Sequence, residues 1–180
     1  MKDEQMDETW MDDLLVEISG VDGCFRIQAA ITIPEHIDEV WNLATQSATV
    51  GWWFSPGKIE AEGGRIQLNY IDGSFGMAGD VKVLFPPHVF EFTWDAHELS
   101  EQTIIRFDFV ATGDRATRAT VTSFVFDGLD TTYLVIATWR FMLERLQRAV
   151  TSETEIPDDE SRVAQLVREI RQQHERQELG

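Results

Sequence analysis

Residues 128–151 read GLDTTYLVIATWRFMLERLQRAVT and predict the longest helix of the chain. The segment has an apolar stripe, because its apolar side chains recur every three or four residues. The stripe consists of Val135, Trp139, Met142, Leu143, Leu146 and Val150. A stripe of this kind is buried in a folded domain, so we expect the helix to pack on the sheet that the preceding residues form.

The residues before this helix fall into short segments in which apolar and polar side chains alternate, as in β-strands. Turn signals such as Gly63-Gly64 and Pro86-Pro87 separate these segments. The predicted strands are residues 24–33, 58–62, 65–71, 77–85, 88–94, 103–111 and 116–126, with 14–19 as a short extra strand. A helix from Glu35 to about Thr45 follows Pro34. No connection is long enough for a crossover between parallel strands, so the sheet is expected to be antiparallel.

Several of these strands carry aromatic side chains on a single face. His88, Phe90, Phe92 and Trp94 share one face of their strand, as do Ile105, Phe107 and Phe109, and Ile66, Leu68 and Tyr70. We therefore expect an α+β fold in which a curved antiparallel sheet wraps around the long helix. The rings either fill the space between sheet and helix as an ordinary core or line a cavity there.

The chain is long enough for one domain with a sizeable core. We expect three parts: an acidic N-terminal extension (1–19), the sheet-and-helix domain (20–151), and a linker with an amphipathic tail helix (152–180). The tail helix carries the stripe Val163, Leu166, Val167 and Ile170. This stripe docks either on its own domain or on a protein partner or second copy of the chain.

The net charge of −17 excludes two classes of partner. Residues 1–19 hold seven acidic and one basic residue, and residues 151–180 hold eight acidic and four basic residues. So negative a chain repels nucleic-acid phosphates and anionic lipid, and its acidic surface serves solubility or a basic protein partner. The start of the chain lacks the pattern of a secretory signal, and no apolar run is long enough to span a bilayer. With Cys24 as the single cysteine, we expect a cytoplasmic protein without a disulfide.

The sequence shows no recognisable catalytic or metal-binding motif. His36, His88, His97 and His174 are scattered without zinc-ligand spacing, and no Gly-x-Ser-x-Gly elbow is present. His88 is the one histidine predicted on the inner face. We predict no cofactor, no metal and no catalytic residue set, which favours a binding protein over an enzyme.

A series of spaced residues resembles a known superfamily. The marks are Ile33-Pro34, Val40-Trp41, Trp52-Trp53, Gly63-Gly64, Gly79-Asp80-Val81, Trp94, Gly113 with Thr117, and Trp139 with Leu143 and Leu146. In this order they resemble the polyketide-cyclase and START-related superfamily, of helix-grip (Bet v 1-like) fold. Within it, the chain is similar to the family of the C-terminal domain of the Hsp90 ATPase activator. Two positions depart from the pattern: Ser123 replaces a common His, and Thr138 replaces the Gly before the helix Trp.

The resemblance and the one-sided aromatic faces together imply a ligand site between sheet and long helix. Its expected lining is Trp53, Tyr70, Phe92, Trp94, Phe107, Phe109, Ser123 and Trp139. The expected ligand is an apolar or amphipathic small molecule, lipid-like or polyketide-like. Two alternatives remain open: a protein-interaction domain of the Hsp90 co-chaperone or stress-response type, and a cyclase-like or hydrolase-like enzyme with a polar cluster in the cavity.

Overall fold

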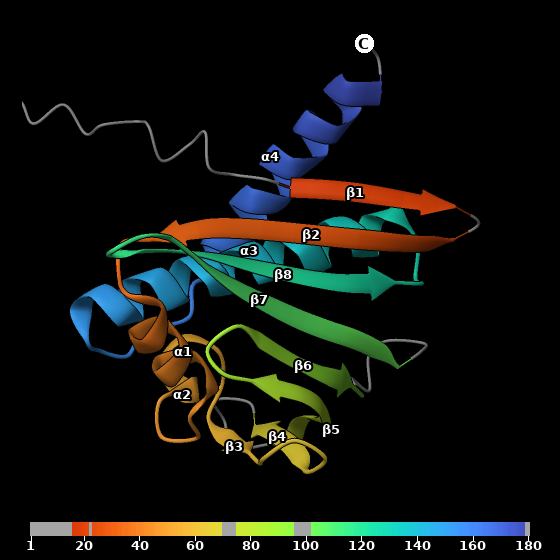
Figure 1. The fold of residues 1–180 in the computed structure, drawn as a ribbon. Helices are drawn as coiled ribbons and strands as arrows, with labels where there is room; N and C mark the ends of the chain where they lie inside the picture. Colours follow the sequence, from red (N-terminus) through yellow and green to blue (C-terminus); the bar gives the residue numbers. More distant parts are fainter. Residues whose placement is uncertain (1–15, 22, 70–74, 96–101, 179–180) are drawn as a thin grey trace, which may run out of the picture.

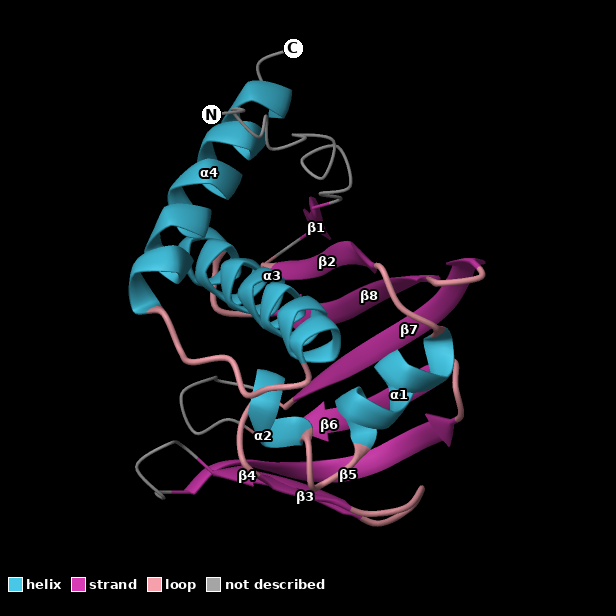
Figure 2. Cartoon of the chain, turned by 90° about the vertical axis from the view of Figure 1, so that its left-hand side faces the viewer, coloured by secondary structure: helices cyan, strands magenta, loops and turns pink. Residues whose placement is uncertain are grey.

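The computed structural model describes residues 16–21, 23–69, 75–95 and 102–178 (Figure 1). Within them, eight strands form one antiparallel sheet in the order β1-β2-β8-β7-β6-β5-β4-β3. The elements are β1 (Val16–Val21), β2 (Cys24–Ile33), α1 (Ile37–Thr45), α2 (Val50–Trp53), β3 (Gly57–Ile59), β4 (Arg65–Asn69), β5 (Phe75–Phe85), β6 (Val89–Trp94), β7 (Thr103–Gly113), β8 (Ala116–Val125), α3 (Leu129–Ser152) and α4 (Glu160–Glu178). Figure 2 shows α1, α2 and α3 on the same face of the curved sheet. This is the predicted α+β helix-grip architecture.

The core lies between this face of the sheet and α3. The strand residues that alternate toward α3 are buried, as predicted for Phe92, Ile105 and Phe107. From α3, Trp139, Leu143 and Leu146 meet them. Apolar burial on this scale is the dominant favourable term in folding, so this layer holds the domain together.

The start of α3 depends on Gly128, the N-cap residue, whose φ of 90° lies in the left-handed region. Thr132 then donates a hydrogen bond from Oγ1 to the Gly128 carbonyl at 2.8 Å.

Within α3 the buried surface is wider than the predicted stripe. It includes Ile136 and two charged residues, Arg140 and Arg145, that no apolar periodicity indicates.

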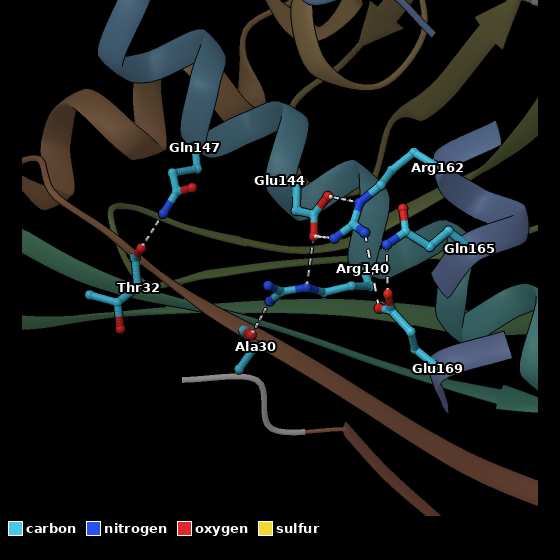
Figure 3. A network of polar contacts seen from close by, with 8 residues as sticks. All are labelled: Ala30, Thr32, Arg140, Glu144, Gln147, Arg162, Gln165 and Glu169. Carbon is cyan, nitrogen blue, oxygen red and sulfur yellow. Dashed lines mark hydrogen bonds and ion pairs between the residues drawn. The ribbon is translucent and has the colours of Figure 1, made fainter. Parts of the chain in front are cut away.

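Polar side chains of α3 also bond to the backbone of β2. Arg140 donates from Nη1 to the Ala30 carbonyl at 3.0 Å, and Gln147 donates from Nε2 to the Thr32 carbonyl at 2.7 Å. Figure 3 shows both contacts beneath α3. The two carbonyls are two residues apart and therefore point to the same edge of the strand. The helix is thus fixed to β2 by directed hydrogen bonds as well as by its apolar face.

The tail helix α4 docks on its own domain. Leu166 and Ile170 of its stripe are buried, and Val163 and Val167 are partly buried against the same core. Arg162 forms two hydrogen bonds with Glu144 of α3, at 3.0 Å and 2.7 Å. None of the described helices is both long and apolar enough to cross a lipid bilayer.

Some predicted elements differ from the observed ones. The segment around Trp52-Trp53-Phe54 contains the short helix α2, which was not predicted. The first helix begins at Ile37 instead of Glu35, because His36 acts as its N-cap and accepts a hydrogen bond from the Asp38 amide. His88 is exposed in the β5–β6 turn, so its predicted inner-face position is wrong. Of the predicted acidic extension, the described residues 16–19 belong to β1, and residues 1–15 lie outside the described part.

Candidate functional site

A cleft of about 460 Å³ lies where α2 and α3 meet the β4–β5 side of the sheet. Its lining is mostly apolar and comes from several distant segments. The lining residues are Phe54, Ser55, Leu68, Asn69, Gly76, Met77, Trp94, Thr138, Met142 and Asp158. Leu68 and Met77 are fully buried, whereas Asp158 is exposed, so the cleft runs from the core toward the surface.

One wall of the cleft is a cluster of three aromatic rings. Phe54 stacks on Trp94 with ring centroids 5.7 Å apart, and lies 5.4 Å from Trp139. Trp94 meets Trp139 edge to face at 5.5 Å. Such pairs contribute about 0.5–1.5 kcal/mol each beyond their buried area. Phe54 and Trp94 are the members of the cluster that border the cleft.

Arg145 holds this wall in place from behind. Its side chain is 3% exposed and donates from Nη1 to the Phe54 carbonyl at 3.2 Å. From Nε and Nη2 it donates to the Ile156 carbonyl at 3.0 Å and 2.6 Å. The Ile156 amide in turn donates to the Trp52 carbonyl at 2.9 Å. The end of α2 and the α3–α4 linker are thus joined through one buried guanidinium.

Burial lowers the pKa of the Arg145 guanidinium, while the carboxylates of Asp158 and Glu155 act in the opposite direction. Desolvation disfavours a charged group in the interior, and the two nearby carboxylates offset part of this effect. Asp158 therefore has two roles: it lines the mouth of the cleft and helps to keep the buried cation charged.

The polar groups of the lining have limited catalytic potential. The Ser55 hydroxyl donates to the Asn69 carbonyl, and the Thr138 hydroxyl donates to the Leu134 carbonyl at 2.9 Å. Asp158 is the single titratable side chain among the described lining residues. General acid–base catalysis usually pairs titratable groups within reach of a substrate, and these residues do not form such a pair. The described residues also contain no group of three His, Cys, Asp or Glu arranged for a metal ion.

The predicted lining residues are divided between cleft and core. Trp94 borders the cleft. Trp53, Phe92, Phe107, Phe109 and Trp139 are buried in the closed core beside it. Phe107 lies at the centre of that core, with ring centroids 5.6 Å from Trp53 and from Trp139 and 6.3 Å from Phe109. These rings fill the space between sheet and helix, which corresponds to the core-packing alternative. Tyr70 lies outside the described residues.

Ser123 is buried on the inner face of β8, and its hydroxyl has no hydrogen-bond partner. The indole nitrogens of Trp53 and Trp94 are likewise buried without a partner. A buried polar group without a partner typically costs about 1–3 kcal/mol. Of these three residues, Trp94 borders the cleft, so one of the unpaired indole nitrogens belongs to a lining side chain.

Sequence reasoning missed Phe54, Met77 and Met142 as lining residues. Met142 belongs to the predicted apolar stripe of the long helix, but periodicity does not show which inward-facing residues border empty space. Arg145 was missed as well, because on a helical wheel it lies about 60° beyond Met142, outside the predicted apolar stripe.

Comparisons with known proteins agree with this fold. CalU16 from Micromonospora echinospora has a TM-score of 0.66 at 16% sequence identity, over 87% of this chain and 90% of that chain. EF2215, a conserved protein of unknown function from Enterococcus faecalis, has a TM-score of 0.66 at 16% identity, over 87% of this chain and 91% of that chain. DynU16, a protein in the dynemicin biosynthetic locus, has a TM-score of 0.64 at 21% identity, over 75% of this chain but 49% of that chain. At these identities the similarity shows a shared fold.

None of the curated proteins matches this sequence. The sequence model of one protein family matches residues 30–151, from the middle of β2 to the end of α3. The matched region contains most of the sheet, α1, α2 and α3, and it spans more than half of the chain. The chain belongs to the family described as Activator of Hsp90 ATPase homolog 1-like protein.

Proposed function

We propose that this protein binds an apolar or amphipathic small molecule in the cleft beside Phe54 and Trp94. The observation that carries the proposal is the cleft itself, with its volume of about 460 Å³ and its mostly apolar lining. Sites for small molecules typically have about 300–1,000 Å³ and are lined by apolar side chains with a few polar groups. The lining follows this composition, with Leu68, Met77 and Met142 at its apolar part and Asn69 and Asp158 among its polar groups.

The cleft reaches the protein surface at the exposed Asp158, so it contains water when no ligand is bound. Water makes few hydrogen bonds with an apolar lining, and an apolar molecule gains free energy by displacing it.

The ligand that fits is a molecule with a lipid-like chain or a flat polyketide-like ring system. Its apolar part would lie against the Phe54–Trp94 wall, and its polar end would face Asp158 and the solvent. The closed aromatic core around Phe107 is not part of this site, because its rings already fill the space.

The test compares two tryptophan substitutions on the same helix. Met142→Trp places a bulky ring in the cleft at a partly exposed position of α3, and Leu134→Trp is the matched control because Leu134 is exposed and does not line the cleft. The probes are monodecanoylglycerol for the lipid class and 2-hydroxy-1,4-naphthoquinone for the polyketide class. Binding is measured by native mass spectrometry and by the shift in melting temperature.

We expect at least one probe to bind the wild-type protein and the Leu134→Trp variant, and to bind Met142→Trp at least tenfold more weakly. Equal binding to all three proteins would place the ligand elsewhere. If neither probe binds the wild-type protein, these two ligand classes are wrong.

A second proposal, association with a protein partner of the Hsp90 chaperone type, is supported by the family and by an apolar surface patch. Ile104 of β7 and Phe124 of β8 are exposed on the outer face of the sheet. The tail helix is a weaker candidate surface, because Leu166 and Ile170 are buried in the domain. We expect an Ile104→Ser/Phe124→Ser variant to lose binding to purified Hsp90 in a sedimentation assay, while Val110→Ser retains it. Unchanged binding of the double variant would refute this surface.

A further inference from the structure

A second pocket, of about 210 Å³, lies between α3, β2 and the first turn of α4. It is separate from the apolar cleft and shares no lining residue with it. Its lining consists of Ile31, Thr32, Arg140, Glu144, Gln147, Arg148 and Arg162. Figure 3 shows Arg140 and Arg162 beside Glu144, and Gln147 directed toward Thr32; Arg148 is not drawn.

The charge of this pocket is opposite to that of the protein. Three arginines and one glutamate line it, which leaves a net charge of +2 among the lining side chains. The whole chain has 15 basic against 32 acidic residues. A positive pocket on so acidic a protein is a local feature that the overall composition does not predict.

The carboxylate of Glu144 forms ion pairs with two of the arginines, Arg140 and Arg162. Its Oε1 lies 3.3 Å from Arg140 Nε and 2.7 Å from Arg162 Nη2, and its Oε2 accepts from Arg162 Nε at 3.0 Å. Glu169, outside the pocket lining, lies 4.0 Å from Arg162 Nη1. Glu144 therefore fixes the positions of two guanidinium groups and neutralises one positive charge.

Arg148 supplies the remaining charge. It follows Glu144 by four residues, a spacing at which helical side chains commonly form an ion pair. Within the described part of the chain, however, its guanidinium has no hydrogen bond or ion pair, because Glu144 is turned toward Arg140 and Arg162. An exposed, unpaired arginine thus lies at the edge of a pocket that already has positive charge.

We propose that this pocket binds a small oxyanion of the phosphate or sulfate class. Guanidinium groups match the geometry of such oxygens and form charge-assisted hydrogen bonds with them. The volume of about 210 Å³ accommodates a tetrahedral anion with several waters, each of which occupies roughly 30 Å³. An anion here would contact both α3 and the start of α4, so its binding would strengthen the docking of the tail helix.

The test measures the melting temperature in sodium phosphate and in sodium chloride of equal ionic strength and pH. The key variant is Arg148→Gln, because this side chain is exposed and forms no hydrogen bond or ion pair with the described residues. Arg168→Gln is the matched control: it removes the same charge from an exposed position of α4 that does not line the pocket. Phosphorus NMR of inorganic phosphate reports binding directly.

We expect phosphate at ten times its dissociation constant to raise the melting temperature of the wild-type protein and of Arg168→Gln by roughly 3–6 °C relative to chloride. For Arg148→Gln the shift should fall to less than half of that value. An equal shift in all three proteins, or no shift in the wild type, would overturn the proposal.

A phosphate group can also be presented by a lipid, so a second arm uses phosphatidylcholine vesicles with and without phosphatidic acid. We expect no sedimentation with either vesicle, because the net charge of −17 repels an anionic surface. Sedimentation with the phosphatidic acid vesicles alone, without a response to inorganic phosphate, would refute a free anion as the ligand. This result is independent of the apolar cleft, whose test uses other residues and probes.

Discussion

The guanidinium of Arg145 donates two hydrogen bonds to the backbone carbonyl of Ile156, from Nη2 at 2.6 Å and from Nε at 3.0 Å. This contact joins the middle of α3 to the linker that leads into α4. Since Arg145 also donates to the Phe54 carbonyl, the same side chain positions the aromatic wall of the cleft. The family match ends at residue 151, so this contact connects the family domain to a segment beyond the match.

Replacing Arg145 with methionine should strongly destabilise the protein. Methionine has an unbranched apolar side chain, but it leaves the carbonyls of Ile156 and Phe54 buried without a donor. We expect the free energy of unfolding to fall by roughly 2–4 kcal/mol, measured by urea denaturation. Arg148→Met, which removes an exposed arginine, should change it by less than about 0.5 kcal/mol. Equal losses in both variants would show that Arg145 is not a structural anchor.

The central ring of the closed core gives a second prediction. Phe107 lies within 6.4 Å, between ring centroids, of Trp53, Phe90, Phe92, Phe109 and Trp139. Phe107→Ala should therefore reduce the free energy of unfolding by about 3–5 kcal/mol. The matched control is Phe85→Ala, because Phe85 is 61% exposed and should cost less than about 0.5 kcal/mol. A small effect at Phe107 would mean that the core relaxes around the missing ring.

The fold was largely predictable because its strongest signals are periodic. The apolar stripe that includes Trp139, Leu143 and Leu146 predicted α3, and alternation predicted the inward rings of β6 and β7. Residues 24–33 were predicted as a strand with the bounds that β2 has. Alternation reports which face a side chain takes, and in an antiparallel sheet one face is commonly buried.

The site was less predictable. Alternation shows that a ring points toward α3, but it does not show whether that ring packs against others or borders an empty space. Phe92, Phe107 and Trp139 point inward as predicted, but they pack against other rings and leave no space. The cleft opens instead beside Phe54, at the end of a four-residue helix that propensity does not indicate. The burial of Arg145 depends on backbone carbonyls of α2 and the linker, which only the tertiary structure brings together.

The third prediction concerns the close approach of the β5 and β6 backbones at Gly79. A Cβ at this position would lie 1.7 Å from the Thr93 carbonyl oxygen, so the two strands could not keep their separation. Gly79→Ala should reduce the free energy of unfolding by about 1–3 kcal/mol or more. At Gly113 the nearest atom to such a Cβ is 3.7 Å away, so Gly113→Ala should be nearly neutral. Thermal unfolding of the two variants distinguishes them, and an equal effect would contradict close packing at Gly79.

Asp159, which precedes α4, predicts how the tail helix responds to acid. Hydrogen bonds from the Ser161 side chain and from the Arg162 amide hold the pKa of the Asp159 carboxyl below its ordinary value of 3.8. The folded protein therefore binds this proton less readily than the unfolded chain. The stabilising contribution of the Asp159 carboxylate is complete well above pH 3.8 and is lost as the pH falls through the lowered pKa.

An Asp159→Asn variant tests this contribution, because asparagine keeps a capping side chain but cannot titrate. When the pH is lowered from neutral to 3, the melting temperature of this variant should fall less than that of the wild type. Asp114→Asn, in the β7–β8 turn, should behave like the wild type. Identical acid responses of all three proteins would show that the Asp159 carboxylate does not stabilise α4.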